Sequence, residues 1–213
     1  QAKSDYRFKG DVAVQTFAFQ DAVSIPSAMA RIDSLYTGDA IKAELDLDAE
    51  TPATVSDQLN ALLGDRLKLS TALTAGFETR KIEISRLDAL GDAVRLTAKG
   101  DTVADGPFNL SGKLDLPQLE RLYPDLHGAA ALDWRAVQRA NGELSATAKG
   151  ATKGLEWADP ELARAFGDTA NLDASVKRAK SGALDFALTG DAGALSLKGD
   201  GGLREDQLDA HLD

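Results

Sequence analysis

Alternation of apolar and polar residues at every second position runs through most of this 213-residue chain. Successive side chains of a strand point to opposite faces, so each alternating segment predicts a strand with one apolar and one polar face. Such strands are typical of an antiparallel sheet that is wet on one side, rather than a parallel sheet covered on both. The clearest examples are segments 41–48, 66–73, 81–84, 108–116, 143–148, 171–176, 184–189 and 195–197.

A short Lys-Gly motif repeats along the chain. The copies begin at Lys9, Lys99, Lys149 and Lys198. Two longer copies, GDAVRLTAKGD and GDAGALSLKGD, also agree with each other. Internal similarity at a steady spacing indicates one structural unit stacked on itself. Since Gly and Asp favour turns, we predict that the motif ends a strand and begins a tight turn.

Three short helices are predicted between the strands, near residues 52–63, 117–123 and 160–166. Thr51 is the predicted N-cap of the first helix, with Pro52 as its first residue. Asp159 and Gly167 are the corresponding start and stop signals of the third. Helices this short are not stable alone, so we expect each to dock its apolar side on the sheet.

The number of predicted strands constrains the shape of the sheet. About fifteen strands are too many for a flat open sheet, since large sheets curl, split or close. Many apolar positions hold Ala, Gly or Thr, and only 6% of the residues are aromatic. We therefore predict an all-β fold, a long curled antiparallel sheet with a groove-like apolar interior and a few short helices. Residues 1–213 are expected to be one continuous repetitive segment, a fragment of a longer chain.

Composition argues against several functions. The net charge of −10 disfavours nucleic acid as a partner. The sequence has no Cys, which excludes disulfides and thiolate metal sites, and its two His residues lie in no metal-binding motif. It has neither a nucleophile elbow nor a phosphate-binding loop. We expect no metal, no cofactor and no enzymatic activity.

The apolar face is the remaining candidate site. It is either an ordinary packed core or a channel for acyl chains, and the pattern alone leaves both open. The residues predicted to line such a channel are Phe8, Leu45, Ile84, Leu96, Phe108, Leu110, Leu144, Leu184, Phe186 and Leu195.

The segment GPFNLSGKLDLPQLERLYPDLHGAAALDW resembles the TamB-like (translocation and assembly module) and AsmA-like β-groove family. The resemblance rests on a strand with Leu-Ser-Gly, then Leu-Asp-Leu, a short helix of the PQLERLYP type and a new strand. It implies a middle segment of a periplasmic protein that is anchored in the inner membrane of a Gram-negative bacterium. It also implies that phospholipid acyl chains move along the sheet toward the outer membrane. An Omp85-type, TamA-like outer-membrane barrel is the implied partner, and outer-membrane protein assembly a further implied role.

Two alternatives belong to other classes. An extracellular β-solenoid or adhesin-like scaffold would have a solid core and would act through its outer face. An enzyme of the β-helix polysaccharide-lyase kind would need acids clustered with Arg or Lys on a flat outer sheet, which the sequence does not indicate. Within the leading hypothesis, the client is either lipid or an unfolded outer-membrane strand.

Overall fold

The structure, a computed structural model, describes residues 5–19, 23–104, 106–204 and 207–213. The chain divides into two compact units, Gln1–Ala104 and Asp105–Asp213. All strand pairs with a defined register are antiparallel, and the 14 strands are not closed into a barrel. The predicted fold class, an antiparallel all-β fold with a few short helices, is confirmed.

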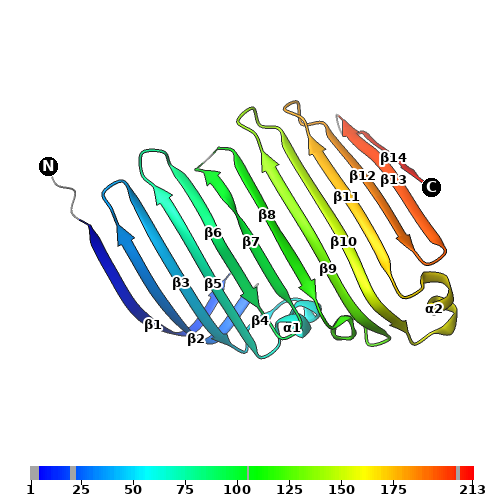
Figure 1. Ribbon diagram of the computed structural model, residues 1–213, viewed down its shortest axis with the longest axis horizontal. Helices are drawn as coiled ribbons and strands as arrows, with labels where there is room; N and C mark the ends of the chain where they lie inside the picture. Colours follow the sequence, from blue (N-terminus) through cyan, green and yellow to red (C-terminus); the bar gives the residue numbers. More distant parts are fainter. Residues whose placement is uncertain (1–4, 20–22, 105, 205–206) are drawn as a thin grey trace. The chain divides into compact units, whose positions relative to one another are not determined.

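In the first unit, six long strands lie side by side in the order β1-β2-β3-β5-β6-β7, and α1 lies at one end of them (Figure 1). The short strand β4 pairs with β2. The elements are β1 (Tyr6–Phe19), β2 (Val23–Tyr36), β3 (Ala40–Glu50), β4 (Ala53–Thr54), α1 (Asp57–Leu63), β5 (Arg66–Gly76), β6 (Lys81–Leu90) and β7 (Arg95–Val103).

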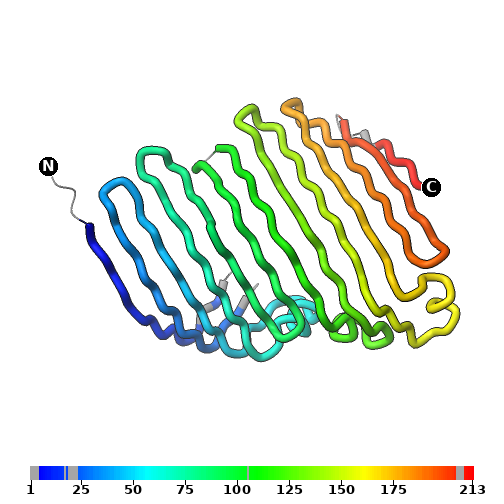
Figure 2. The backbone as a smooth tube through the Cα atoms, in the orientation of Figure 1, coloured from blue at the N-terminus to red at the C-terminus, as the bar shows by residue number. Residues whose placement is uncertain are grey.

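In the second unit, seven strands lie side by side in chain order from β8 to β14 (Figure 2). Helix α2 lies at the opposite end of the strands from the turn that joins β9 to β10 (Figure 1). The elements are β8 (Phe108–Leu116), the 3-10 turn η1 (Leu119–Arg121), β9 (Leu126–Gln138), β10 (Leu144–Trp157), α2 (Pro160–Phe166), β11 (Ala170–Arg178), β12 (Leu184–Ala192), β13 (Leu195–Arg204) and β14 (Gln207–Leu212).

Strand register places the apolar residues of each unit on one face. Residues directly opposite each other in an antiparallel pair share a face, so the pairings can be followed across the sheet as cross-strand rows. In the first unit one row is Val12, Ala30, Leu47, Leu69, Ala89 and Leu96. In the second unit one row is Leu110, Ala136, Ala146, Val176, Phe186 and Gly201. We call this face the apolar face of each unit and the opposite one its polar face.

The Lys-Gly motif lies inside strands, not at turns, so the turn prediction was wrong. Gly10 is in β1, Gly100 in β7, Gly150 in β10 and Gly199 in β13. Each glycine occupies the apolar face opposite a large side chain; Gly10, for example, pairs with Ile32. In the first copy the flanking Lys9 and Asp11 lie on the polar face and pair with Asp33 and Arg31, and in the third copy Lys149 pairs with Asp173. In these copies the motif supplies charge pairs on one face and a gap on the other.

The hairpin turns use other glycines. Gly142 and Gly182 have φ of 86° and 92°, and they close the turns between β9 and β10 and between β11 and β12. The two turns are built alike, because the Gly142 amide donates to Arg139 O and the Gly182 amide donates to Ala179 O. These two hairpins therefore share one turn geometry, which is separate from the Lys-Gly motif.

The helix predictions had mixed outcomes. Helix α2 spans 160–166, with Asp159 as its N-cap and Gly167 as its C-cap, as predicted. Helix α1 begins at Asp57 rather than near Pro52, because Ser56 is the N-cap and accepts a hydrogen bond from Leu59 N. The predicted helix at 117–123 is only the short 3-10 turn at 119–121.

Candidate functional site

The ten residues predicted to line a channel all lie on the apolar face of their own unit. In the first unit Phe8 and Ile84 share one cross-strand row, and Leu45 and Leu96 lie in adjacent rows. In the second unit Phe108, Leu144 and Leu184 share a row, as do Leu110 and Phe186, and Leu195 lies nearer α2. That these side chains contact acyl chains remains a prediction.

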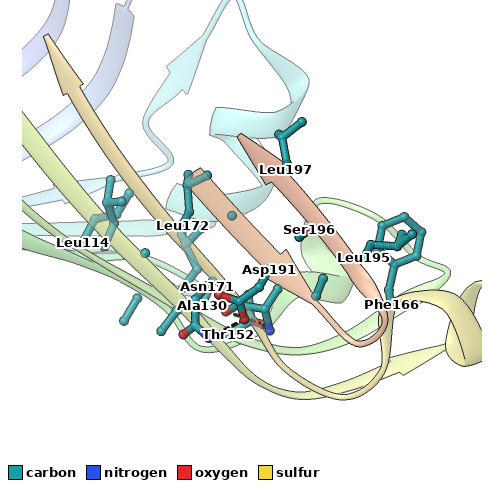
Figure 3. Close-up of a pocket in the computed structure, with 18 residues that line it drawn as sticks. Leu114, Ala130, Thr152, Phe166, Asn171, Leu172, Asp191, Leu195, Ser196 and Leu197 are labelled. Carbon is teal, nitrogen blue, oxygen red and sulfur yellow. Dashed lines mark hydrogen bonds between the residues drawn. The ribbon is translucent and has the colours of Figure 1, made fainter. Parts of the chain in front are cut away.

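The apolar face of the second unit has a hollow near α2, with a volume of about 590 Å³ (Figure 3). This volume lies within the range of about 300–1,000 Å³ that is typical of small-molecule sites. Two cross-strand rows of the apolar face, together with Phe166 of α2, form most of the lining. These two rows are Leu114, Leu132, Gly150, Leu172, Gly190, Leu197 and Leu116, Ala130, Thr152, Ala170, Ala192, Leu195. The row between them completes the lining with Ala131, Ala151, Asn171, Asp191 and Ser196 (Figure 3).

Alternation of leucine and glycine explains the hollow. Gly150 of β10 lies between Leu132 of β9 and Leu172 of β11, and Gly190 of β12 lies between Leu172 and Leu197. A Cβ on Gly150 would lie 3.4 Å from Leu132 Cδ1 and 3.5 Å from Leu172 Cβ. The leucines are therefore ridges, and each glycine leaves a gap between two of them. Gly150 belongs to one of the Lys-Gly motifs, which links the repeat to the shape of this surface.

Helix α2 closes one end of the hollow. Asp159 Oδ1 accepts hydrogen bonds from Glu161 N at 2.7 Å and from Leu162 N at 3.4 Å, and the C-cap amide of Gly167 donates to Ala163 O. These caps hold a helix of only two turns in place. The ring of Phe166 stacks on that of Trp157, with centroids 5.1 Å apart.

Thr152, the hydroxyl residue of the two apolar-face rows that line the hollow, forms hydrogen bonds with the backbone. Its Oγ1 accepts a hydrogen bond from Ala170 N at 2.7 Å and donates to Ala170 O at 3.3 Å. The hydroxyl is therefore engaged with the sheet, so the side chains of the two apolar-face rows offer the hollow no free polar group.

The apolar face is open to solvent. Phe8 is 59% exposed, Leu195 46% and Leu172 41%. Over the described ranges no large side chain is completely buried, and the buried apolar residues are Ala28, Ala30, Ala49, Leu62, Ala93, Leu119 and Leu155. The accessible surface of 14144 Å² exceeds the roughly 9,500 Å² expected for a compact monomer of 22.5 kDa. Apolar surface that a solid core would bury is therefore exposed to solvent and accessible to a ligand.

On the polar face, ion pairs join charged side chains of neighbouring strands. In the first unit Asp33 accepts from Arg7 Nη2 at 2.6 Å and pairs with Lys9 Nζ at 2.8 Å, and these contacts hold the pKa of Asp33 well below its usual range. Hydrogen bonds from Arg66 likewise lower the pKa of Asp48.

The second unit repeats this arrangement. Lys149 Nζ lies 2.6 Å from Asp173 Oδ2, and the bond raises the pKa of Lys149. Exposed pairs of this kind stabilise only modestly, but they specify the register, since a one-residue slip would turn them toward the apolar side.

The described residues hold no cluster of His, Cys, Asp or Glu that is able to bind a metal ion. Among the helices of the same residues, none has the length and apolar character needed to cross a membrane. Comparison with protein-family models, curated proteins and solved structures finds no match. The fold and surface therefore define an open antiparallel β-sheet protein with an exposed apolar face, and the TamB-like resemblance rests on the residues quoted above.

Sequence reasoning missed most of the hollow. Of the ten predicted lining residues, Leu195 is part of its lining, whereas Gly150, Gly190 and Phe166 were not predicted to line a channel. Alternation identifies the face of each residue but not which residues of neighbouring strands are opposite. The Lys-Gly motif is the signal that could have located Gly150, but Gly and Asp also favour turns, so the motif alone does not distinguish a strand from a turn.

Proposed function

We propose that this chain is a non-enzymatic segment of a TamB-like lipid conduit, whose apolar face holds phospholipid acyl chains. The observation that carries the proposal is the apolar face of each unit, which remains exposed although it contains large side chains such as Phe8 in the first unit and Leu172 in the second. Transfer of an acyl chain from water to such a surface gains up to about 0.8 kcal/mol per CH₂. Leu and Ala contacts lack directional preference, which suits a tail that slides.

A scaffold with a solid core, the main alternative, fits the exposure less well. A solid core buries large apolar side chains on both sides, whereas the described part of this chain buries mainly alanines. Charged residues of the polar face also pair with each other, as Lys149 does with Asp173, which leaves fewer of them free to bind a partner on the outer face. The periplasmic location, the inner-membrane anchor and the TamA-like Omp85-type partner belong to the proposal through the family resemblance.

Site-specific photocrosslinking in cells tests the proposal. Photoreactive residues replace Phe186 and Leu195 on the apolar face, with Ala187 and Lys198 on the polar face of the same two strands as controls. The proposal predicts phospholipid captured at the first pair only. Absence of lipid at Phe186 and Leu195, in a chain that still folds, would contradict it and favour the scaffold.

A further inference from the structure

One charged side chain interrupts the apolar face of the second unit. Arg178, the last residue of β11, lies opposite Leu144 of β10 and Leu184 of β12, so it belongs to an apolar cross-strand row. At the other positions of this face, in the rows whose side chains are described, the residues are apolar or glycine, apart from Gln138 and Thr152. The described part of the first unit has no charge in its corresponding rows.

Among the described residues the Arg178 side chain has no acidic partner, and the same is true of Lys177 and Lys198 on the polar face. Lys149 pairs with Asp173, Arg139 with Glu143 and Arg204 with Asp185. No side-chain hydrogen bond or ion pair joins Arg178 to any residue that the structure describes, and its side chain is exposed. An exposed guanidinium on an apolar face retains its full capacity to bind an anion by a forked pair of hydrogen bonds.

The position of Arg178 relative to the hollow suits an amphiphile. Leu172, in the hollow, and Arg178 are six positions apart on β11, which corresponds to about 20 Å along a strand. One leaflet of a bilayer has a hydrocarbon thickness of about 15 Å, which is the span of one lipid tail. The remaining length accommodates the polar linkage of the lipid and the side chain of Arg178. Between the two ends, β11 offers Ala174 and Val176 on the same face.

We propose that Arg178 binds the phosphate of a phospholipid whose tail lies along β10 and β11, with its methyl end in the hollow beside Phe166. The inference rests on the proposed function and adds to it an orientation and a headgroup contact. Gln138, on the other side of Leu144 in the same row, supplies a second hydrogen-bond donor at this end of the face. We take a phospholipid as the occupant, because its phosphate suits the forked donors of Arg178 and its linkage and tail together span the distance from Arg178 to the hollow.

Equilibrium binding to the purified chain tests the headgroup contact. The probes are 1-palmitoyl lysophosphatidylglycerol, which carries a phosphate, and 1-palmitoylglycerol, which has the same tail and no charge. Arg178→Gln should weaken binding of the phosphate probe about tenfold, as expected for the loss of a charge-assisted hydrogen bond, and leave the neutral probe unchanged. Lys177→Gln is the matched control, since it removes the same charge from the polar face of the same strand.

The outcomes separate this inference from the proposed function. An equal loss of affinity for the phosphate probe in Arg178→Gln and Lys177→Gln, or no loss in either, would overturn the role of Arg178. If both probes still bound the unmodified chain, the proposed function would stand. Failure of both probes to bind the unmodified chain would overturn both proposals. A photoreactive group at the methyl end of the lysophospholipid should label the region of Phe166 and Leu195, and labelling near Leu144 and Leu184 instead would reverse the proposed orientation.

Discussion

Gly150 lies directly opposite Leu172 on the apolar face, and a Cβ on Gly150 would lie only 3.5 Å from Leu172 Cβ. On the polar face, the preceding residue Lys149 pairs with Asp173, the residue that follows Leu172. One Lys-Gly motif thus fixes the pairing of two strands by charge and leaves a gap between apolar ridges. The predictions below test the two faces separately.

Filling the gap should weaken lipid binding without unfolding the chain. In Gly150→Leu the new side chain would occupy the space between Leu132 and Leu172, displacing two to three CH₂ groups of a bound tail. At about 0.8 kcal/mol per CH₂, palmitoyl lysophospholipid should bind roughly 15- to 60-fold more weakly in a titration. Thr147→Leu adds the same side chain to the polar face of β10 and should leave the affinity unchanged. Equal effects of the two substitutions would contradict the account.

A charge in the hollow should act more strongly. Leu172 is 41% exposed, so Leu172→Asp can keep its carboxylate hydrated in the free protein and the fold should tolerate it. A bound tail would cover that carboxylate, at a cost of several kcal/mol unless it becomes protonated. Lipid binding should therefore be lost at pH 7, as measured by tail-labelled lipid. Ser175→Asp, on the polar face of the same strand, should bind normally; unchanged binding by Leu172→Asp would show that tails do not occupy the hollow.

Gly193 should be less tolerant of substitution than Gly142. Both have positive φ, of 54° and 86°. A Cβ on Gly193 would lie 2.7 Å from Ala165 O at the end of α2, whereas one on Gly142 would meet nothing within 4 Å. Chemical denaturation should show a loss of roughly 2–4 kcal/mol for Gly193→Ala and about 1–2 kcal/mol for Gly142→Ala. Similar losses would mean that the turn does not pack on α2 as described.

The N-cap of α2 should contribute measurably to stability. Asp159→Ala removes the acceptor of two backbone N–H groups, and N-cap replacements of this kind cost about 0.5–2 kcal/mol. Asp159→Asn retains an acceptor and should recover most of the loss in urea denaturation. If the alanine and asparagine variants were equally stable, the capping interaction would not operate in solution.

Acid should destabilise the first unit through the polar face. The pKa values of Asp33 and Asp48 are lowered in the folded chain by Arg7 and by Arg66. Their contribution is fully present above the unfolded carboxyl pKa of about 4 and is lost as pH falls toward the lower folded pKa. The urea concentration at the midpoint of unfolding should therefore decrease when the pH is lowered below 4. Combining Arg7→Gln with Arg66→Gln should flatten this decline, and Lys177→Gln, in the second unit, should not; a decline that is unchanged by the double variant would contradict the assignment.

Strand positions and faces could be predicted from the sequence because alternation is local. Helix α2 was also predictable, since Asp159 and Gly167 both signal its ends within a few residues. The start of α1 was not, because Pro52 resembles a first helical residue, whereas the chain first forms β4 at 53–54 and uses Ser56 as the N-cap. The role of Gly150 depends on Leu132 and Leu172 of neighbouring strands, and only the register reveals those partners. The isolation of Arg178 among apolar neighbours was hidden for the same reason.

The central claim is that acyl chains occupy the apolar face and not the polar face. The sequence has no cysteine, so single cysteines at Ala148 and Thr147, adjacent on β10 but on opposite faces, can each carry an environment-sensitive fluorophore. On titration with phospholipid, the account predicts a blue shift and saturable binding at position 148, with no change at position 147. No change at 148, or equal changes at both positions, would show that the apolar face is not a lipid-binding surface.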